Sequence, residues 1–146
     1  MKEKANIMIS NVADQDNQSR DVLIKIWLER TLNLLARREH SRVELIRKLI
    51  AKTCPPEIAD IIVDHCLEKG YLSLIRFAEC YSKNKAASGY GPKKIRLELN
   101  AHEVSSDDIS CAFEQIDWEK AKLIALRKIK HTDPIKLKNA LYLRGF

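Results

Sequence analysis

The sequence predicts an all-α protein, an elongated and curved array of tandem three-helix repeats of helix-turn-helix type whose third repeat is incomplete. Three observations predict this fold. Only four glycines and four prolines occur in 146 residues, which leaves few turn residues for a β architecture. Apolar residues recur at the three- and four-residue spacing of helices along most of the chain. A longer pattern of apolar anchors occurs three times, each at the end of an expected helix.

The N-terminal region divides into an arm and a helix. Residues 1–20 are expected to form a flexible arm, because they are largely polar and show little apolar periodicity after Ile9. Apolar residues return at helical spacing over residues 21–38, which predicts a lead helix with one buried stripe. We expect Trp27 in this helix, and Trp118 near the other end of the chain, to be core anchors.

The next two helices have recognisable starts and ends. Ser41 and Glu44 form a capping box, in which the serine accepts a backbone N–H and the glutamate reaches back to the cap. A helix therefore begins there, and the Cys54-Pro55-Pro56 stretch ends it, because proline disfavours helical geometry in the preceding residue. Pro56 or Glu57 begins a further helix, which Gly70 ends in left-handed geometry.

Similar signals continue toward the C-terminus. Ser73 caps a helix that Gly89 and Gly91 end, and Pro92 stands at the first turn of the next helix. The later helix starts are Ser106 or Asp107, then Asp117, and finally Asp133-Pro134, whose short helix ends at Gly145.

One anchor pattern occurs three times at these helices: an apolar residue, another after three intervening residues, and a third after four more. Two anchors stand one helical turn apart and the third lies just past the helix end, which describes a helix entering a tight corner. The copies are Leu45, Leu49 and Cys54; Ile95, Leu99 and Val104; and Leu137, Leu141 and Phe146.

The helices around each copy are expected to complete a three-helix unit, because two helices cannot bury their stripes alone. This division gives a first repeat over residues 21–70, a second over 71–116 and a partial third over 117–146. A row of such units is elongated and curved, which suits binding along another large surface.

Composition favours a cytoplasmic protein with an anionic partner. Lysine and arginine exceed aspartate and glutamate by six. No apolar run approaches the roughly 20 residues of a membrane span, and the N-terminus lacks the pattern of a signal peptide. No Cys-x-x-Cys pair is present, so neither a metal site nor a disulfide framework is expected. Each cysteine is interpreted as a small buried residue, and the four are Cys54, Cys66, Cys80 and Cys111.

Positive charge gathers in stretches without acids, notably residues 83–96 and 120–130. Tyr90, between two glycines, is expected at an exposed corner, where its ring stacks or anchors an interface. The alternative is that these cations are solvated helix faces that keep the protein soluble. The residues expected to bind a partner or DNA are Arg37, Arg38, Arg42, Lys83, Lys85, Tyr90, Lys93, Lys94, Arg96, Arg127, Lys128, Lys130, Lys136, Lys138 and Arg144.

Enzymatic activity is not expected. The four histidines are scattered, and no nucleophile with a base, paired carboxylate or phosphate-binding glycine loop is recognisable. No catalytic residue, cofactor or metal is therefore predicted. The alternative function left open is direct DNA binding by a helix-turn-helix, although Ile58, Asp107 and Asp108 are apolar or acidic where base-reading side chains would stand.

Several motifs resemble signatures of the RecX family, in order and in spacing. They are Leu35-Ala-Arg-Arg-Glu-His-Ser-Arg-Val-Glu-Leu, Glu68-Lys-Gly-Tyr-Leu, Arg76-Phe-Ala, Gly89-Tyr-Gly-Pro-Lys-Lys-Ile-Arg-Leu-Glu-Leu, Ile116-Asp-Trp and Tyr142-Leu-Arg-Gly-Phe. The resemblance covers about residues 30–146, and residues 89–99 are its most specific part. Two departures stand out: Ser73 and Leu74 replace the acidic pair usual before Arg-Phe-Ala, and the family's helix after Arg-Gly-Phe is missing.

This resemblance implies a modulator of the RecA recombinase, active in DNA repair, recombination and the SOS response. It implies tandem three-helix repeats that lodge in the groove of the RecA filament on single-stranded DNA. Family members thereby limit filament growth, strand exchange, and the ATPase and coprotease activities of RecA. The expected partners are the RecA filament and single-stranded DNA, contacted directly or through RecA, with no membrane, and the chain is expected to be a monomer.

Overall fold

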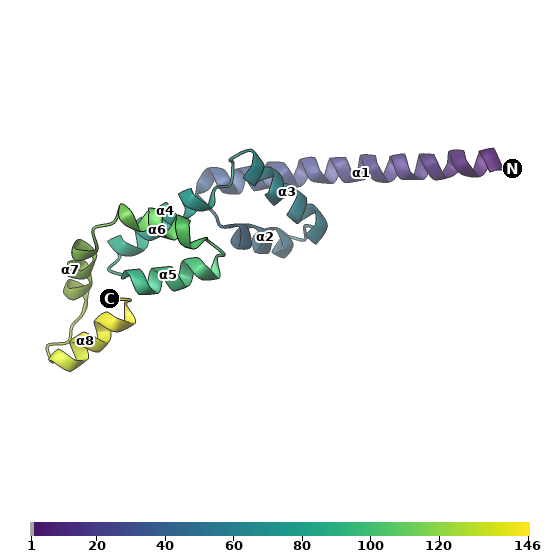
Figure 1. Ribbon diagram of the computed structural model, residues 1–146. Coiled ribbons are helices and arrows are strands. Elements are labelled where there is room, and N and C mark those ends of the chain that lie inside the picture. Colours follow the sequence, from purple (N-terminus) through teal and green to yellow (C-terminus); the bar gives the residue numbers. More distant parts are fainter. Residues whose placement is uncertain (1) are drawn as a thin grey trace. The chain divides into compact units, whose positions relative to one another are not determined.

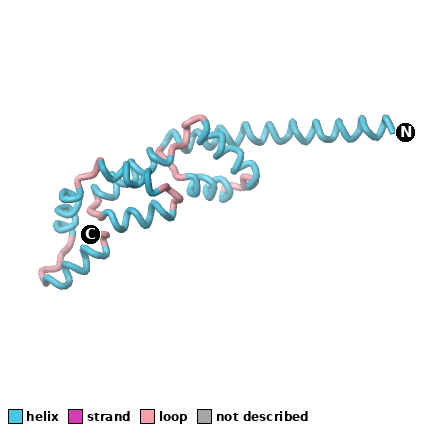
Figure 2. Tube along the Cα trace, in the orientation of Figure 1, coloured by secondary structure: helices cyan, strands magenta, loops and turns pink. Residues whose placement is uncertain are grey.

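The computed structural model describes the backbone of residues 2–146 and the side chains of residues 13–146. Over that range the chain is a succession of helices joined by short loops, with no strand (Figures 1 and 2). The predicted all-α class is confirmed. The helices are α1 (Lys2–Arg37), α2 (Arg42–Ala51), α3 (Pro56–Glu68), α4 (Leu74–Ala87), α5 (Pro92–Ala101), α6 (Ser106–Glu114), α7 (Trp118–Lys128) and α8 (Pro134–Leu143).

Helix α1 begins much earlier than the expected lead helix, and residues 2–20, which were expected to lie in a flexible arm, are helical. Residues 2–37 contain neither glycine nor proline, and nothing in them terminates a helix. Residues 13–23 are all exposed, and the buried face of α1 begins only at Trp27 and Thr31. Residues 13–23 of α1 therefore have no buried stripe by which apolar periodicity could reveal the helix.

The chain divides into two compact units, each with its own core. The first unit contains α1 and residues 45–71, and the second contains residues 39–44 and 72–146. In the first unit α1 packs on α3, over buried side chains that include Trp27, Leu45, Leu49, Ile58, Ile62 and Val63. In the second unit α4 packs chiefly on α6, and the core consists of Phe77, Ala78, Ile95, Leu99, Val104, Ile109 and Ala112.

The two tryptophans anchor different cores. Trp27 is 5% exposed, which confirms it as a core residue of the first unit. Trp118 is half-buried at the edge of the second core, where its ring meets that of Phe113 edge-on at 5.0 Å.

Side-chain caps confirm three of the predicted helix starts. In each case an oxygen of the residue before the helix accepts the N–H three residues later, which satisfies an amide that the helix itself leaves unpaired. These bonds join Glu44 N–H to Ser41 Oγ at 3.1 Å, Arg76 N–H to Ser73 Oγ at 3.3 Å, and Lys120 N–H to Asp117 Oδ1 at 3.0 Å.

Two other starts differ in detail from the expectation. Helix α6 is capped by Ser105, whose Oγ accepts Asp108 N–H at 3.2 Å, and not by Ser106 or Asp107. Serine and aspartate both cap well, and Ser105 directly follows Val104, the buried third anchor of the second pattern. Asp133 is at the N-cap of α8 as predicted, but its side chain makes no cap hydrogen bond.

The three anchor patterns end in the same backbone motif. In each, the third anchor's N–H bonds to the second anchor's carbonyl, and the residue just before the third anchor is left-handed, which is the Schellman arrangement. The bonds run from Cys54 to Leu49 at 3.0 Å, Val104 to Leu99 at 3.1 Å, and Phe146 to Leu141 at 3.1 Å. The left-handed residues are Thr53 (φ 72°), Glu103 (φ 58°) and Gly145 (φ 97°). The pattern therefore marks a recurring corner, and at the first of these corners α2 ends at Ala51, before the prolines.

The cysteines separate into two classes, which corrects the expectation that all four are buried. Cys54 and Cys66 are buried, and burial raises the pKa of both thiols. Cys80 and Cys111 are exposed. Each of these two follows a buried residue, Ala78 or Ile109, by two positions, and a two-residue step on a helix turns the side chain away from the core.

Candidate interaction surface

Residues 89–99, the most specific motif in the sequence, contain the corner between α4 and α5. Gly89 is left-handed (φ 84°), and Tyr90 N–H bonds to the Lys85 carbonyl at 3.1 Å, which closes the end of α4. A side chain at Gly89 would also lie 3.0 Å from the backbone nitrogen of Ala125 in α7. Glycine therefore permits both the turn and the approach of α7. Pro92 occupies the first turn of α5, as predicted.

The C-terminal end of α8 completes this corner (Figure 1). Gly91 N–H donates to the Arg144 carbonyl at 2.6 Å, and Lys93 N–H donates to the Gly145 carbonyl at 3.1 Å. Helix α5 has no side-chain cap, so carbonyls beyond the end of α8 satisfy amides at its start. A Cβ atom on Gly91 would lie 2.5 Å from the Gly145 carbonyl carbon. The two backbones meet directly, and only glycine fits between them.

Tyr90 gathers three cations around its ring. The ring centroid lies 4.7 Å from Lys94 Nζ, 5.2 Å from Lys85 Nζ and 5.5 Å from Arg144 Cζ. Cations within about 6 Å of an aromatic centroid are attracted by the ring's quadrupole. The four side chains are half-buried, so Tyr90 is less exposed than expected. We call the set Lys85, Tyr90, Lys94 and Arg144 the Tyr90 corner.

One carboxylate borders the Tyr90 corner. Glu98 Oε2 lies 3.6 Å from Lys85 Nζ and accepts the hydroxyl of Tyr81. Burial, followed by the hydrogen bond and charge of Glu98, raises the pKa of Tyr81 well above its usual range, so this phenol stays neutral. Among the described residues neither Lys94 nor Arg144 is paired with a carboxylate. The corner therefore keeps an excess of positive charge.

The predicted binding residues are only partly brought together. Four of them form the Tyr90 corner, and Lys128 lies beside it, because its Nζ donates to the Ser88 carbonyl at 3.0 Å. The other predicted cations on α4, α5, α7, α8 and the α7–α8 loop are exposed, and they are Lys83, Lys93, Arg96, Arg127, Lys130, Lys136 and Lys138. Arg37 and Arg38 are exposed in the first unit, and Arg42 is half-buried in the 39–44 segment of the second. That these residues bind a partner stays a prediction.

A second cluster in the same unit was not predicted. Arg76 Nε donates to Glu39 Oε1 at 2.9 Å, and Ser41 Oγ shares a hydrogen bond with His102 Nδ1 at 2.7 Å. The ring of His102 lies 5.0 Å from that of Phe77. The hydrogen-bonded partners are 37 and 61 residues apart in the sequence, so helical spacing gives no sign of them. The Glu-His-Ser and Arg-Phe-Ala motifs therefore meet, and residues 39–44 are held against α4 and the end of α5.

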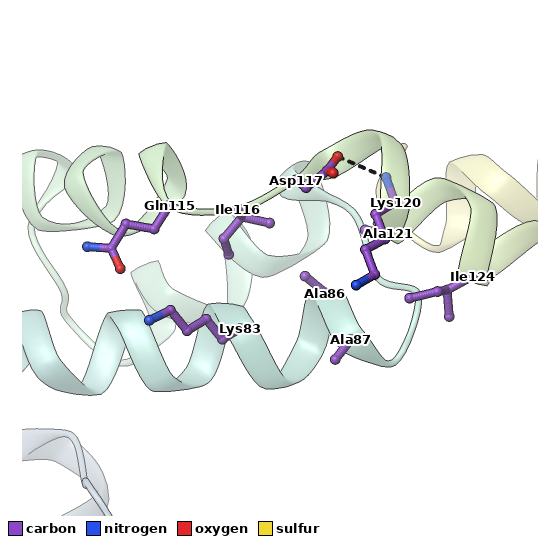
Figure 3. Close-up of a pocket in the computed structure, with 9 residues that line it drawn as sticks. All are labelled: Lys83, Ala86, Ala87, Gln115, Ile116, Asp117, Lys120, Ala121 and Ile124. Atoms are coloured by element: carbon purple, nitrogen blue, oxygen red, sulfur yellow. Dashed lines mark hydrogen bonds between the residues drawn. The ribbon is translucent and has the colours of Figure 1, made fainter.

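A shallow groove of about 400 Å³ lies between α4 and α7. Figure 3 shows Ala86 and Ala87 of α4 on one side, Ala121 and Ile124 of α7 on the other, and Lys83 farther along α4. Three of the lining residues of α4 and α7 are alanines, Ala86, Ala87 and Ala121, so these helices place little side-chain volume in the groove. The groove is thus a consequence of this helix pairing.

Metal-ligand clusters and membrane-spanning helices are both lacking in the described part of the chain. No three histidine, cysteine, aspartate or glutamate side chains converge there as metal ligands would. None of the helices described is long and apolar enough to span a bilayer.

Comparison with known proteins gives matches in family, sequence and fold. The model of the first three-helix domain of RecX matches residues 28–66, and that of the second matches residues 76–112. Regulatory protein RecX of Xanthomonas oryzae pathovar oryzae is 43% identical over 113 residues, which cover 75% of this chain and 71% of the relative. Regulatory protein RecX of Pseudomonas savastanoi pathovar phaseolicola is 46% identical over 91 residues, which cover 61% and 59%.

A solved structure shares the fold. A crystal structure of a regulatory protein RecX matches with a TM-score of 0.70 and 18% sequence identity, covering 88% of this chain and 69% of that chain. The two matched domains contain the end of α1 with α2 and α3, and then α4, α5 and α6. The predicted tandem three-helix organisation is confirmed.

Proposed function

This chain belongs to the RecX family, and from that premise we propose that it docks on the RecA filament formed on single-stranded DNA and restrains the filament's activities. The observation that carries the proposal is the 43% identity to a regulatory protein RecX over 113 residues. The regulatory role follows from membership of the family. RecA as the partner, and inhibition as the result, are what we propose.

The charge of the protein supports a nucleoprotein partner. The chain has a formal net charge of +6, and two cations of the Tyr90 corner, Lys94 and Arg144, are paired with no carboxylate among the described residues. DNA phosphates and acidic patches on a protein filament both attract such a surface, and complementary charge speeds association and orients the partners.

The modular construction supports regulation by binding. Two three-helix domains in tandem supply many modest contacts, and neither domain needs a deep pocket to bind a large partner. RecX is a family of regulatory proteins, which fits an effect on RecA that needs no catalysis by this chain.

Sequence-specific duplex recognition has less support. In a helix-turn-helix the start of the second helix reads base edges in the major groove, beside the phosphates. Here the first turns of α3 and α6 carry Glu57, Asp107 and Asp108. DNA phosphates would repel these carboxylates. We therefore favour docking on the filament over direct reading of DNA sequence.

Two titrations test the proposal. The protein is titrated into RecA hydrolysing ATP on single-stranded DNA and, separately, into naked DNA of random sequence at the same salt concentration. We expect hydrolysis to fall at protein concentrations that leave naked DNA unbound. A DNA-dependent ATPase unrelated to RecA serves as the control and should keep its rate.

Two results would overturn the proposal. One is loss of hydrolysis only at concentrations that coat naked DNA, with equal loss for the control ATPase. The other is sequence-preferring duplex binding with no effect on RecA, which would favour the helix-turn-helix alternative.

A further inference from the structure

We propose that the Tyr90 corner is a phosphate-binding site for single-stranded DNA, in which Tyr90 positions the cations and does not stack on a base. This inference deepens the proposed function and rests on it, because it names the chemistry by which one surface meets the nucleoprotein. Its ligand is the phosphodiester backbone.

The Tyr90 corner carries unbalanced positive charge. Three cations lie 4.7 to 5.5 Å from one ring centroid, and all three are half-buried, where their mutual repulsion is screened less than in bulk water. Glu98 meets only Lys85 among them. A phosphate between Lys94 and Arg144 would replace repulsion by two attractive contacts.

The cations of the Tyr90 corner offer hydrogen-bond donors of the kind that phosphate accepts. Lysine ammonium offers three N–H donors, and the arginine guanidinium is a planar fork that matches phosphate geometry. Arg144 Nη1 makes one long bond, 3.4 Å, to the Gly89 carbonyl, which orients the guanidinium and leaves most of its donors available. The corner therefore presents donors suited to a phosphate.

The faces of the Tyr90 ring are covered by neighbouring groups. Stacking on a base requires an open aromatic face. The Tyr90 ring packs against the core of the second unit, and the groups of Lys85, Lys94 and Arg144 lie over it. Because neighbours already cover the ring, we expect binding that is independent of base identity.

The position of Arg144 depends on the docking of the end of α8 against the start of α5. Arg144 reaches the corner only because the Arg144 and Gly145 carbonyls accept the N–H groups of Gly91 and Lys93. A ligand that binds the docked arrangement alone stabilises it by mass action. Phosphate binding should therefore slow hydrogen exchange at these two amides.

Fluorescence anisotropy with two labelled probes at low salt tests the site directly. One probe is a short oligothymidylate, and the other is an abasic phosphodiester oligomer of the same length. We expect Kd values that agree within about threefold, because phosphate contacts carry no base information. Arg144→Gln should weaken both probes by about fivefold or more and lower the slope of log Kd against log salt by about 0.7, the value for one phosphate contact on a single strand.

Matched variants separate a site from general charge. Lys52→Gln removes one exposed cation of the first unit, from the turn after α2, and should weaken binding less than about twofold, because a cation outside the Tyr90 corner acts only through the screened field of the whole protein. Tyr90→Phe keeps the ring and should bind as wild type, whereas Tyr90→Leu should lose affinity for both probes alike. Circular dichroism checks that each variant is folded.

The following outcomes would overturn the inference. Abasic binding more than about tenfold weaker than oligothymidylate binding would show base stacking. Equal losses in Arg144→Gln and Lys52→Gln would show that no localised site exists. Unchanged exchange at the Gly91 and Lys93 amides in saturating pyrophosphate would refute the linkage to α8.

The two proposals fail separately. If the protein inhibits RecA while neither oligomer binds at the corner, the phosphate site is refuted and the proposed function stands. If both oligomers bind through Arg144 while RecA hydrolysis is unaffected, the site stands and the proposed function is refuted.

Discussion

At the scale of single residues, Tyr81 both packs against two rings and donates a hydrogen bond. Its ring lies 5.5 Å from that of Phe77 and 5.7 Å from that of His102, and its hydroxyl donates to Glu98. The neutral phenol is therefore favoured in the folded state, and the raised pKa expresses that preference.

The raised pKa of Tyr81 predicts lower stability at alkaline pH. Below about pH 10, the ordinary tyrosine pKa, both the folded and the unfolded state are protonated and the full contribution is present. Above that pH the unfolded state loses its proton first, so the free energy of unfolding falls as pH rises. Urea unfolding of wild type and Tyr81→Phe across this range measures the effect.

At neutral pH the free energy of unfolding of Tyr81→Phe should be lower by about 1 kcal/mol, the usual contribution of a hydrogen bond. At alkaline pH it should fall less steeply than that of wild type. Because Cys54 and Cys66 are present in both proteins, their own raised pKa values cancel in the comparison. Parallel declines in the two proteins would contradict this role for Tyr81.

Thiol reactivity should divide the four cysteines into two pairs. The thiolate is the reactive form, and burial both hides the thiol and raises its pKa. Cys80 and Cys111 are exposed and should react with a thiol reagent in the native protein, whereas Cys54 and Cys66 should react only after unfolding. Mass spectrometry of labelled peptides gives the result, and rapid labelling of Cys66 in the native protein would argue against the core described.

The recurring corner is the defining feature at the scale of the element. It combines two helical anchors, a left-handed residue and a third anchor, and it uses a different left-handed residue each time. Threonine at φ 72° is strained, because a left-handed conformation crowds the Cβ atom of any residue other than glycine.

Glycine at the first corner should therefore stabilise the protein. Thr53→Gly should raise the free energy of unfolding by about 1 kcal/mol, the usual cost of a left-handed non-glycine residue. Lys52→Gly, one residue earlier and without a positive φ, should bring no gain and serves as the control. Urea unfolding reports both, and destabilisation by Thr53→Gly would count against the corner as described.

The anchors of α5 allow a matched test of the core. Leu99 is fully buried, while Leu97 on the same helix is 71% exposed. Leu99→Ala should cost about 2 to 5 kcal/mol by leaving a cavity, and Leu97→Ala should cost less than about 0.5 kcal/mol. Similar losses of unfolding free energy in the two variants would contradict the face of α5 that the structure buries.

Elements were predictable where their signals are local. The caps at Ser41, Ser73 and Asp117 follow from neighbouring residues, and so do the anchor triplets. The start of α1 was missed because a helix needs a buried face to show an apolar period, and residues 13–23 are all exposed. Cys80 and Cys111 were wrongly expected to be buried, because that expectation rested on residue type alone. Their positions along α4 and α6 place them away from the buried stripe of each helix.

At the scale of the whole molecule, the candidate site shows what spacing cannot reveal. The sequence indicated the cations individually, but the contact that brings Arg144 to Tyr90 joins residues far apart in the chain. Gly91 and Gly145 lack side chains, which lets the two backbones come into contact. Neither motif alone predicts that contact. The Arg76–Glu39 and Ser41–His102 pairs were missed for the same reason.

We propose that this RecX family member acts on RecA through the basic surface at the start of α5, which includes Lys94 of the Tyr90 corner. The variant that tests it reverses three charges at the start of α5, Lys93, Lys94 and Arg96, each to Glu. Its control reverses Lys25, Lys52 and Lys69, which lie in the first unit and give the same change in net charge.

The decisive measurement is the half-inhibitory concentration of both variants in the assay of RecA ATP hydrolysis on single-stranded DNA, alongside their helical circular dichroism. We predict an increase of at least about tenfold for the α5 variant, equivalent to 1.4 kcal/mol of lost binding, with helicity retained and the control close to wild type. Equal inhibition by the two folded variants would contradict the account.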